Sequence, residues 1–165
     1  MNEKNNRMYS AVTAVTVIIA IFIFIITRFF STALVIGISM EPTLHNGTII
    51  AVTKITEEDD IKRGDIVIAK VADPKTGKSI QIIKRAIGIP GDRIQIKDGG
   101  LYINGGRKKT VKKIREPGKA NEEISLSKDE YFLLGDNVNA SGDSRMFGPV
   151  EKNCIIGIYA GSCPW

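Results

Sequence analysis

The sequence is poor in the residues that build covalent or metal-bound scaffolds. Cys154 and Cys163 are the only cysteines among 165 residues, and their spacing is not that of metal ligands. A disulfide framework and a zinc site are therefore not expected, and a bridge between the two would require the chain to turn back at Gly157 or Gly161. We predict buried or free thiols, no metal and no cofactor.

The chain also lacks internal repeats, low-complexity linkers and a glycine-rich phosphate loop. Its two Gly-Gly pairs, Gly99-Gly100 and Gly105-Gly106, are typical of hairpin turns. Segments with a helical period are nearly absent after residue 33. Together these absences favour one β-rich domain in the second part of the chain.

One long apolar run stands out. The twenty residues from Met8 to Thr27 are uncharged and would span about 30 Å as a helix, which matches the hydrocarbon core of a bilayer. Because the run is apolar on every face, we predict a transmembrane anchor at 8–30. The alternative is a cleavable signal peptide, since Ser31-Thr32-Ala33 has small residues where a cleavage site needs them.

The charges that flank this run predict its orientation. Lys4 and Arg7 outnumber Glu3, so the positive-inside rule places residues 1–7 in the cytoplasm. Arg28 weakens the asymmetry but can snorkel to the interface. We predict a single-pass protein of the cell membrane, with residues 34–165 as one domain outside the cytoplasm.

Basic and acidic residues nearly balance after the anchor, with one exception. Residues 107–115 carry a strong local excess of lysine and arginine. Such a run is either a solvated hairpin, which we favour, or a contact for nucleic acid or anionic headgroups. An extracytoplasmic location argues against nucleic acid as a partner.

Short β-branched runs separated by turn residues predict a mainly antiparallel β domain. Residues 105–127 are more polar than their flanks and are predicted to form a peripheral extension. The predicted strands are 34–38, 48–54, 65–72, 79–87, 93–97, 101–103, 110–114, 130–134 and 155–159.

A serine in a constrained turn follows the apolar run by twelve residues. Pro42 restricts Glu41 to extended geometry after Ser39, and Gly37 allows another backbone to approach closely, as an extended substrate would. On its own, a serine in such a turn is more often structural than catalytic.

Lys84 changes that balance. Alternate residues of a strand share a face, so Lys84 projects with Ile80, Ile82 and Ala86. Desolvation on an apolar face lowers the pKa of a lysine amine from about 10.4 and makes it a usable general base. The alternative is a snorkelling lysine at a sheet edge.

The polar segment 135–145 is the third candidate element. It packs two aspartates, two asparagines, two serines and an arginine behind an apolar strand. It is either a loop of Asx turns or an element whose hydroxyl orients a lysine amine and whose carboxylates neutralise arginines.

Four ordered segments, at 39–44, 63–67, 84–92 and 135–145, resemble the motif boxes of bacterial type I signal peptidases. The resemblance covers the domain from end to end apart from 105–127, and the anchor placed just before the serine is similar too. It implies an antiparallel β catalytic domain after one transmembrane helix. It also implies a membrane-bound serine endopeptidase that cuts signal peptides from exported preproteins after small residues. The implied partners are preprotein signal peptides and the lipid bilayer, with the secretion translocon as a further candidate.

Residue roles follow from the same resemblance. Ser39 matches the nucleophile, Lys84 the general base, and Ser141 the serine that orients the lysine amine. The supporting charged positions, which we expect to hold the loop against the lysine strand, are Arg85, Asp136, Asp143 and Arg145. The positions expected beside the substrate are Val35, Ile36, Gly37, Met40 and Leu44.

Two features depart from the family pattern or compete with it. Many members have a serine or threonine where this chain has Gly37, so the second oxyanion donor is left open, and a missing donor costs about 3 kcal/mol. His45 offers a Ser/His pair as in a related branch, but it lies in a different loop from Ser39, and the base position holds Lys84.

Two other functions compete with the peptidase. One is a self-cleaving Ser/Lys regulator, although we find no DNA-binding module before Ser39. The other is an anchored β domain that binds partners and keeps the boxes as structure. Ser31-Thr32-Ala33 also resembles what such a peptidase cuts, which raises the question of self-cleavage.

Overall fold

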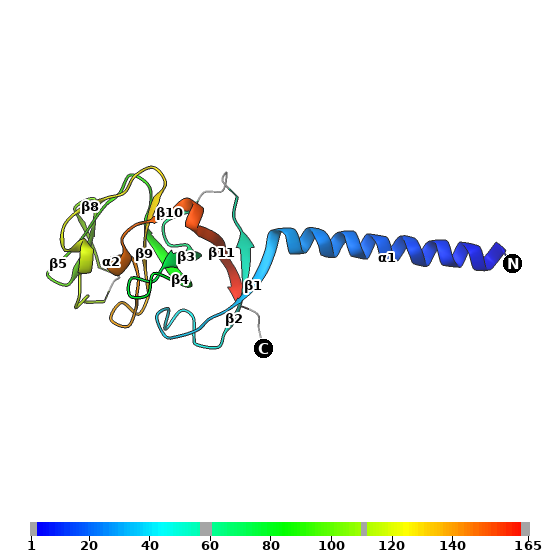
Figure 1. Ribbon diagram of the computed structural model, residues 1–165, viewed down its shortest axis with the longest axis horizontal. Helices are drawn as coiled ribbons and strands as arrows, with labels where there is room; N and C mark the ends of the chain where they lie inside the picture. The colour runs from blue at the N-terminus through cyan, green and yellow to red at the C-terminus, as the bar shows by residue number, and fades with distance from the viewer. Residues whose placement is uncertain (1–2, 57–60, 110–111, 163–165) are drawn as a thin grey trace.

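The computed structural model describes residues 3–56, 61–109 and 112–162, and it begins with a long helix, α1 (Glu3–Phe29). Its segment Arg7–Phe29 has a mean hydropathy of 2.7 and is long and apolar enough to cross a membrane. Figure 1 shows α1 projecting away from the β domain. The apolar run Met8 to Thr27 therefore lies within α1. Phe30, the last residue of the predicted anchor, is instead the first residue of strand β1 (Phe30–Leu34).

Two antiparallel sheets and a short helix, α2 (Ser144–Phe147), form most of the remainder, which confirms the predicted fold class. The larger sheet has the strand order β1-β2-β11-β3-β4-β9-β10, and the smaller has the order β7-β6-β5-β8. The strands of the larger sheet are β1 (Phe30–Leu34), β2 (Ile49–Lys54), β3 (Ile66–Ala72), β4 (Ser79–Gly88), β9 (Glu130–Leu134), β10 (Val150–Glu151) and β11 (Ile155–Ser162). Those of the smaller sheet are β5 (Arg93–Lys97), β6 (Gly100–Ile103), β7 (Gly106–Lys108) and β8 (Ile124–Ser125).

Two predicted strands are wrong. The one expected at 34–38 lies earlier, at Phe30–Leu34, because the chain leaves the sheet before Gly37, whose φ of 92° is not extended backbone. No strand occurs at 112–114, and residues 110 and 111 lie outside the described residues. In this segment Ile114 is buried and donates its N–H to the Gly99 carbonyl at 3.0 Å. A buried side chain and a single hydrogen bond therefore hold the segment in place of strand pairing.

The segment 105–127 supplies β7, β8 and a 3₁₀ turn (Gly118–Asn121) between them. Ile114, Ala120 and Leu126 from this segment pack in one core cluster with Phe132 of β9. Figure 1 shows the smaller sheet at the end of the molecule opposite α1. The basic residues Arg107 and Lys108 of β7 are therefore remote from the helix.

Two other hydrophobic clusters fix the elements that carry the candidate site. Val35, Met40 and Leu44, on both sides of Ser39, are buried in one cluster. Ile82 and Ala86 of β4 are buried in the other, and Cys154, a free thiol, packs against it half-buried. Cys163 lies outside the described residues.

Candidate active site

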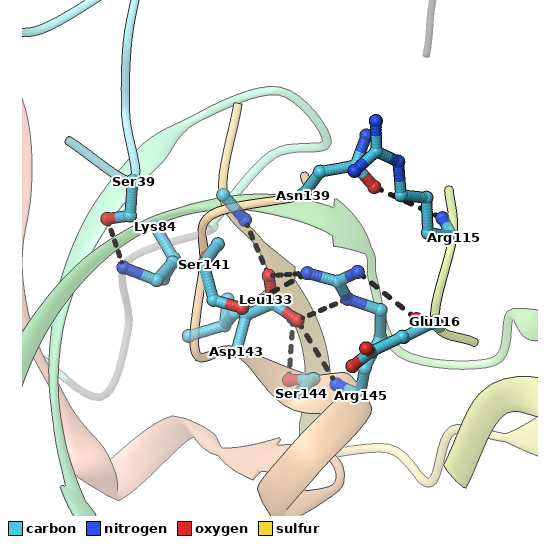
Figure 2. A network of polar contacts seen from close by, with 11 residues as sticks. Ser39, Lys84, Arg115, Glu116, Leu133, Asn139, Ser141, Asp143, Ser144 and Arg145 are labelled. Atoms are coloured by element: carbon cyan, nitrogen blue, oxygen red, sulfur yellow. Dashed lines mark hydrogen bonds and ion pairs between the residues drawn. The ribbon is translucent and has the colours of Figure 1, made fainter. Parts of the chain in front are cut away.

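Ser39 and Lys84 meet in the structure although 45 residues separate them. The Lys84 Nζ donates a hydrogen bond to Ser39 Oγ at 2.8 Å (Figure 2). It also donates to the carbonyl of Ile83 at 2.8 Å, which fixes the direction of the amine. The turn after β1 and the strand β4 thus bring a hydroxyl and an amine into proton-transfer distance.

Lys84 lies on the apolar face that the alternation in β4 predicts. Its side chain is only 5% exposed, and Ile82 and Ala86 on the same face are buried as well. Burial lowers the pKa of Lys84 to about 8, and the negative charge of Asp143 opposes part of this effect. The amine is therefore far easier to deprotonate than an ordinary lysine.

Asn137 holds the Ser39 turn from the opposite side. Its backbone N–H donates to the Ser39 carbonyl at 3.0 Å, and its Nδ2 donates to the Ile38 carbonyl at 3.2 Å. Within the turn, the Leu44 N–H donates to the Met40 carbonyl at 2.9 Å. Nothing in the sequence indicates this role, because an asparagine in a polar loop is usually explained by local turns.

Arg85 and Asp136 tie the loop at 135–145 to β4. Arg85 donates to Asp136 from Nε at 2.8 Å and from Nη2 at 2.6 Å. Thr43, in the turn after Ser39, donates to Asp136 at 2.5 Å. Burial favours a higher pKa for Asp136, but the hydrogen bonds from Arg85 and Thr43 outweigh it and keep the pKa below its usual value. One carboxylate thereby links β4 to the Ser39 turn.

Asp143 and Arg145 pair with each other instead of reaching β4. The Arg145 Nε lies 2.7 Å from Asp143 Oδ1, and Nη2 lies 2.9 Å from Oδ2, with both side chains buried (Figure 2). Asp143 also accepts the Gly135 N–H at 3.1 Å, while Arg145 donates to the Glu116 carbonyl at 3.2 Å. Because only one residue separates Asp143 from Arg145, their ion pair lies within the loop itself. The hydrogen bond from Arg145 to the Glu116 carbonyl attaches this loop to the segment at 105–127.

Ser141 differs from its predicted role. Its hydroxyl is buried and, within the described residues, has no hydrogen-bond partner, so it does not bond to Lys84. It nevertheless lies close to the Ser39 turn, because a methyl group on Gly135 would clash with Ser141 Oγ and would also lie 2.6 Å from the Ser39 carbonyl oxygen. Gly135 is a second residue whose importance the sequence did not reveal.

This close approach gives a direct prediction for Gly135→Ala. The added methyl group must push Ser141 and the Ser39 turn aside, and displacements near 1 Å in an active site can cost about 10²-fold in rate. We expect that loss in peptide-bond hydrolysis by the purified variant. Gly142→Ala is the matched control in the same loop, since its nearest contact would be Met146 Sδ at 3.5 Å. Equal activity of the two variants would contradict this role of Gly135.

An open cavity of about 460 Å³ lies beside Ser39 and Lys84. Of the positions predicted beside the substrate, Val35, Ile36 and Met40 line it. Gly37 and Leu44, both in the described part of the chain, do not: Leu44 is 2% exposed in the core, and Gly37 donates its N–H to Asn46 Oδ1 at 2.8 Å. The sequence did not predict the rest of the lining, which is Thr32, Ala33, Leu34, Ile68, Gln81, Ile82 and Ile83.

Neither His45 nor a metal-ligand cluster forms a rival catalytic site in the described part of the chain. His45 is exposed, and its Nδ1 lies 4.0 Å from a carboxylate oxygen of Glu41. Within the described residues, no cluster of three or more potential metal ligands occurs. Two larger cavities, of about 570 and 530 Å³, are lined by neither Ser39 nor Lys84, so we locate the site by its chemistry and not by its size.

The family described as signal peptidase, peptidase S26, matches residues 8–162 of the chain. The chain belongs to this family. It is therefore a serine endopeptidase of the signal peptidase type, and the resemblance seen in the sequence is confirmed.

Two Bacillus relatives agree with the family assignment. Signal peptidase I of Bacillus licheniformis is 34% identical over 94% of the chain and 88% of its own length. Signal peptidase I T of Bacillus subtilis (strain 168) is 37% identical over 86% of the chain and 78% of its own length. A crystal structure of a signal peptidase I from Enterococcus faecalis V583 matches 61% of the chain and 97% of that structure, with 26% identity and a TM-score of 0.44.

Proposed function

We propose that this S26 peptidase cleaves signal peptides from preproteins after small residues, with Ser39 as nucleophile and Lys84 as general base. The observation that carries the proposal is the 2.8 Å contact between Lys84 Nζ and Ser39 Oγ, with the lysine stem buried. The cavity beside this pair has an apolar wall and an open side, which suits a short extended peptide segment.

The chemistry follows from the positions of these two groups. Neutral Lys84 takes the Ser39 proton as Oγ attacks the scissile carbonyl, and the Ser39 N–H donates to the resulting oxyanion. The ammonium of Lys84 then protonates the departing amine, which leaves an ester on Ser39. A water molecule, deprotonated by the same lysine, hydrolyses the ester and restores the enzyme. In this scheme Arg85, Asp136, Asp143 and Arg145 hold the loop at 135–145 in place.

The same proposal includes a membrane topology. Residues 8–30 are the anchor, residues 1–7 remain in the cytoplasm, and residues 34–165 form the catalytic domain outside. The apolar surface of α1 supports a lipid environment, because the segment Arg7–Phe29 has no buried residues. The basic residues of β7 belong to the end of the domain far from this helix, which argues against contact with the same bilayer. The secretion translocon remains a candidate partner.

The position of Ser31-Thr32-Ala33 argues against cleavage of the chain at that point. All five residues of β1 pair with β2, with Ala33 opposite Ile50. A peptide bond within a paired strand must leave its ladder before it can enter an active site. We therefore expect α1 to remain attached to the catalytic domain.

Substitution of the nucleophile tests the proposal. In liposomes that contain the full chain and a preprotein, we expect Ser39→Ala to abolish cleavage, because the hydroxyl supplies the covalent intermediate. Ser31→Ala is the matched control, since Ser31 is an exposed serine on β1. N-terminal sequencing of the product should show a cut after a small residue. Cleavage by Ser39→Ala at the wild-type rate would refute the assignment.

The pH dependence of cleavage separates the two candidate bases. The pKa of Lys84 is lowered to about 8, so its neutral fraction, and with it kcat/KM, should rise through about pH 8 and level off above it. His45→Gln should leave this profile unchanged, because His45 is exposed and does not line the cavity that Ser39 and Lys84 line. A pH profile that changes in His45→Gln would favour the Ser/His alternative.

A further inference from the structure

The outer face of the smaller sheet brings cationic side chains together. Four residues of β5 and β6 are buried in the core: Ile94, Ile96, Leu101 and Ile103. Alternate residues of a strand share a face, so Lys97 and Tyr102 lie on the opposite, outer face. Arg107 of β7 stands opposite Tyr102 in the ladder and therefore shares that face.

Two glycines allow these side chains to lie close to the sheet. Gly100 stands opposite Lys97 and is buried although it belongs to the outer face. A methyl group on Gly100 would lie 2.9 Å from Arg107 Nε, so the Arg107 side chain covers this position. The Lys113 side chain covers Gly99 in the same way, because a methyl group there would lie 2.7 Å from Lys113 Cγ. We call Lys97, Arg107 and Lys113 the cationic cluster.

The charge of the cationic cluster is not neutralised by the protein. Residues 97–115 contain seven lysines and arginines and one acidic residue, Asp98. Among the described residues, no carboxylate forms an ion pair with Lys97, Arg107 or Lys113. Uncompensated cations that converge on one face raise the local concentration of anions and attract polyanions in particular.

Tyr102 adds an uncharged surface to the cationic cluster. The Lys97 Nζ lies 5.1 Å from the centroid of the Tyr102 ring, which is a cation–π contact, and Arg107 stands opposite Tyr102 on the next strand. In the described part of the chain, the smaller sheet carries no exposed large hydrophobic residue, so it lacks the apolar centre of an interface with a folded protein. The surface fits a hydrophilic polymer in which anionic groups alternate with uncharged units.

We propose that the cationic cluster binds a phosphodiester polymer outside the membrane, with phosphates on Lys97, Arg107 and Lys113 and uncharged polyol or sugar units on Tyr102. A guanidinium fork and two ammonium groups suit phosphate oxygens. The smaller sheet lies at the end of the molecule opposite α1, so the phosphates are not those of the anchoring bilayer (Figure 1). The inference rests on the proposed topology, which places this domain outside the cytoplasm and away from nucleic acid.

The test measures binding of fluorescein-labelled poly(glycerol phosphate) by fluorescence anisotropy, with the full chain in dodecyl maltoside micelles. The first variant removes the cationic cluster by three substitutions: Lys97→Gln, Arg107→Gln and Lys113→Gln. Its control removes the same number of charges from exposed lysines elsewhere: Lys70→Gln, Lys78→Gln and Lys128→Gln. Cleavage of a short peptide with a small-residue site is measured on the same samples.

A second variant keeps every charge and changes only the geometry. Gly100→Ala should displace the Arg107 guanidinium, because the added methyl group would lie 2.9 Å from its Nε. Gly106→Ala is the matched control on the same hairpin, since its methyl group would lie 3.4 Å from the Ile103 carbonyl oxygen, its nearest contact. This pair separates a built site from a diffuse positive field.

We expect the wild type to bind the polymer saturably at low salt and more weakly as salt is added. Removal of the cationic cluster should weaken binding about 10²-fold, at roughly fivefold for each cation, and Gly100→Ala should weaken it about fivefold. The lysine control and Gly106→Ala should stay within about threefold of the wild type. Every variant should cleave the short peptide at the wild-type rate, because the cationic cluster does not line the catalytic cavity. That readout also shows that the variants are folded.

A wild type that does not bind the polymer saturably would overturn the proposal. Equal losses in the two triple variants, or equal binding by Gly100→Ala and Gly106→Ala, would also overturn it, because net charge alone would then explain the attraction. Stronger displacement of the labelled polymer by poly-L-glutamate or phosphatidylglycerol nanodiscs than by unlabelled poly(glycerol phosphate) would replace the polymer with an acidic polypeptide or a lipid surface. Polymer binding by a wild type that does not cleave the peptide would count against the proposed function alone.

Discussion

Lys84→Met is expected to lower kcat for preprotein cleavage by about 10³-fold or more, with a much smaller change in KM. Methionine keeps the apolar stem of the side chain but removes the amine that lies 2.8 Å from Ser39 Oγ. Substrate contacts made by the cavity wall should survive, because Ile82 and Ile83 remain in place. Steady-state cleavage of a preprotein by the full chain in detergent micelles gives both constants.

A lysine elsewhere on the fold provides the control for this experiment. Lys78 is exposed beside β4, so Lys78→Met should retain wild-type kcat. The Lys84→Met protein should also be at least as stable as the wild type, because a buried amine is costly to desolvate. More than a tenth of wild-type kcat in Lys84→Met would remove Lys84 from the mechanism.

Asp143→Ala is expected to lower the free energy of unfolding by about 3–5 kcal/mol. Arg145 is only 6% exposed, and this substitution leaves its guanidinium buried without the carboxylate that binds it at two positions. The Gly135 N–H loses its acceptor as well. Urea unfolding of the full chain in micelles, followed by circular dichroism, measures the change.

Two further variants show whether the unpaired charge is the cause. Asp143→Ala combined with Arg145→Met should be more stable than Asp143→Ala alone, because no buried cation is then left unpaired. Asp129→Ala removes an exposed carboxylate near Lys128 and should change stability by less than about 0.5 kcal/mol. If Asp143→Ala matches Asp129→Ala, the buried pair does not stabilise the loop.

The sequence was most informative where one residue's surroundings follow from a simple period. The alternation in β4 placed Lys84 with Ile82 and Ala86, and all three are buried in the structure. Two of the predicted strands, at 93–97 and 130–134, have the observed bounds. Such local patterns depend on neighbours in the chain, so they can be recognised without knowledge of the fold.

The errors near the site have a common physical origin. Leu44 was expected beside the substrate, but the turn after Ser39 directs it into the core. The contacts of Asn137 and Gly135 with the Ser39 turn join segments nearly one hundred residues apart, so no local sequence pattern reveals them. The start of β1 was misplaced because its pairing with β2, and not its own composition, defines the strand.

Acylation of Ser39 tests the central claim most directly. A serine-directed acylating probe is added to the full chain in micelles across a range of pH, and mass spectrometry locates and quantifies the adduct. The account predicts labelling at Ser39 in the wild type that accelerates through about pH 8, and almost no labelling in Lys84→Met. Equal labelling of Ser39 in the two proteins, or cleavage of a preprotein by a wild type fully labelled at Ser39, would contradict it.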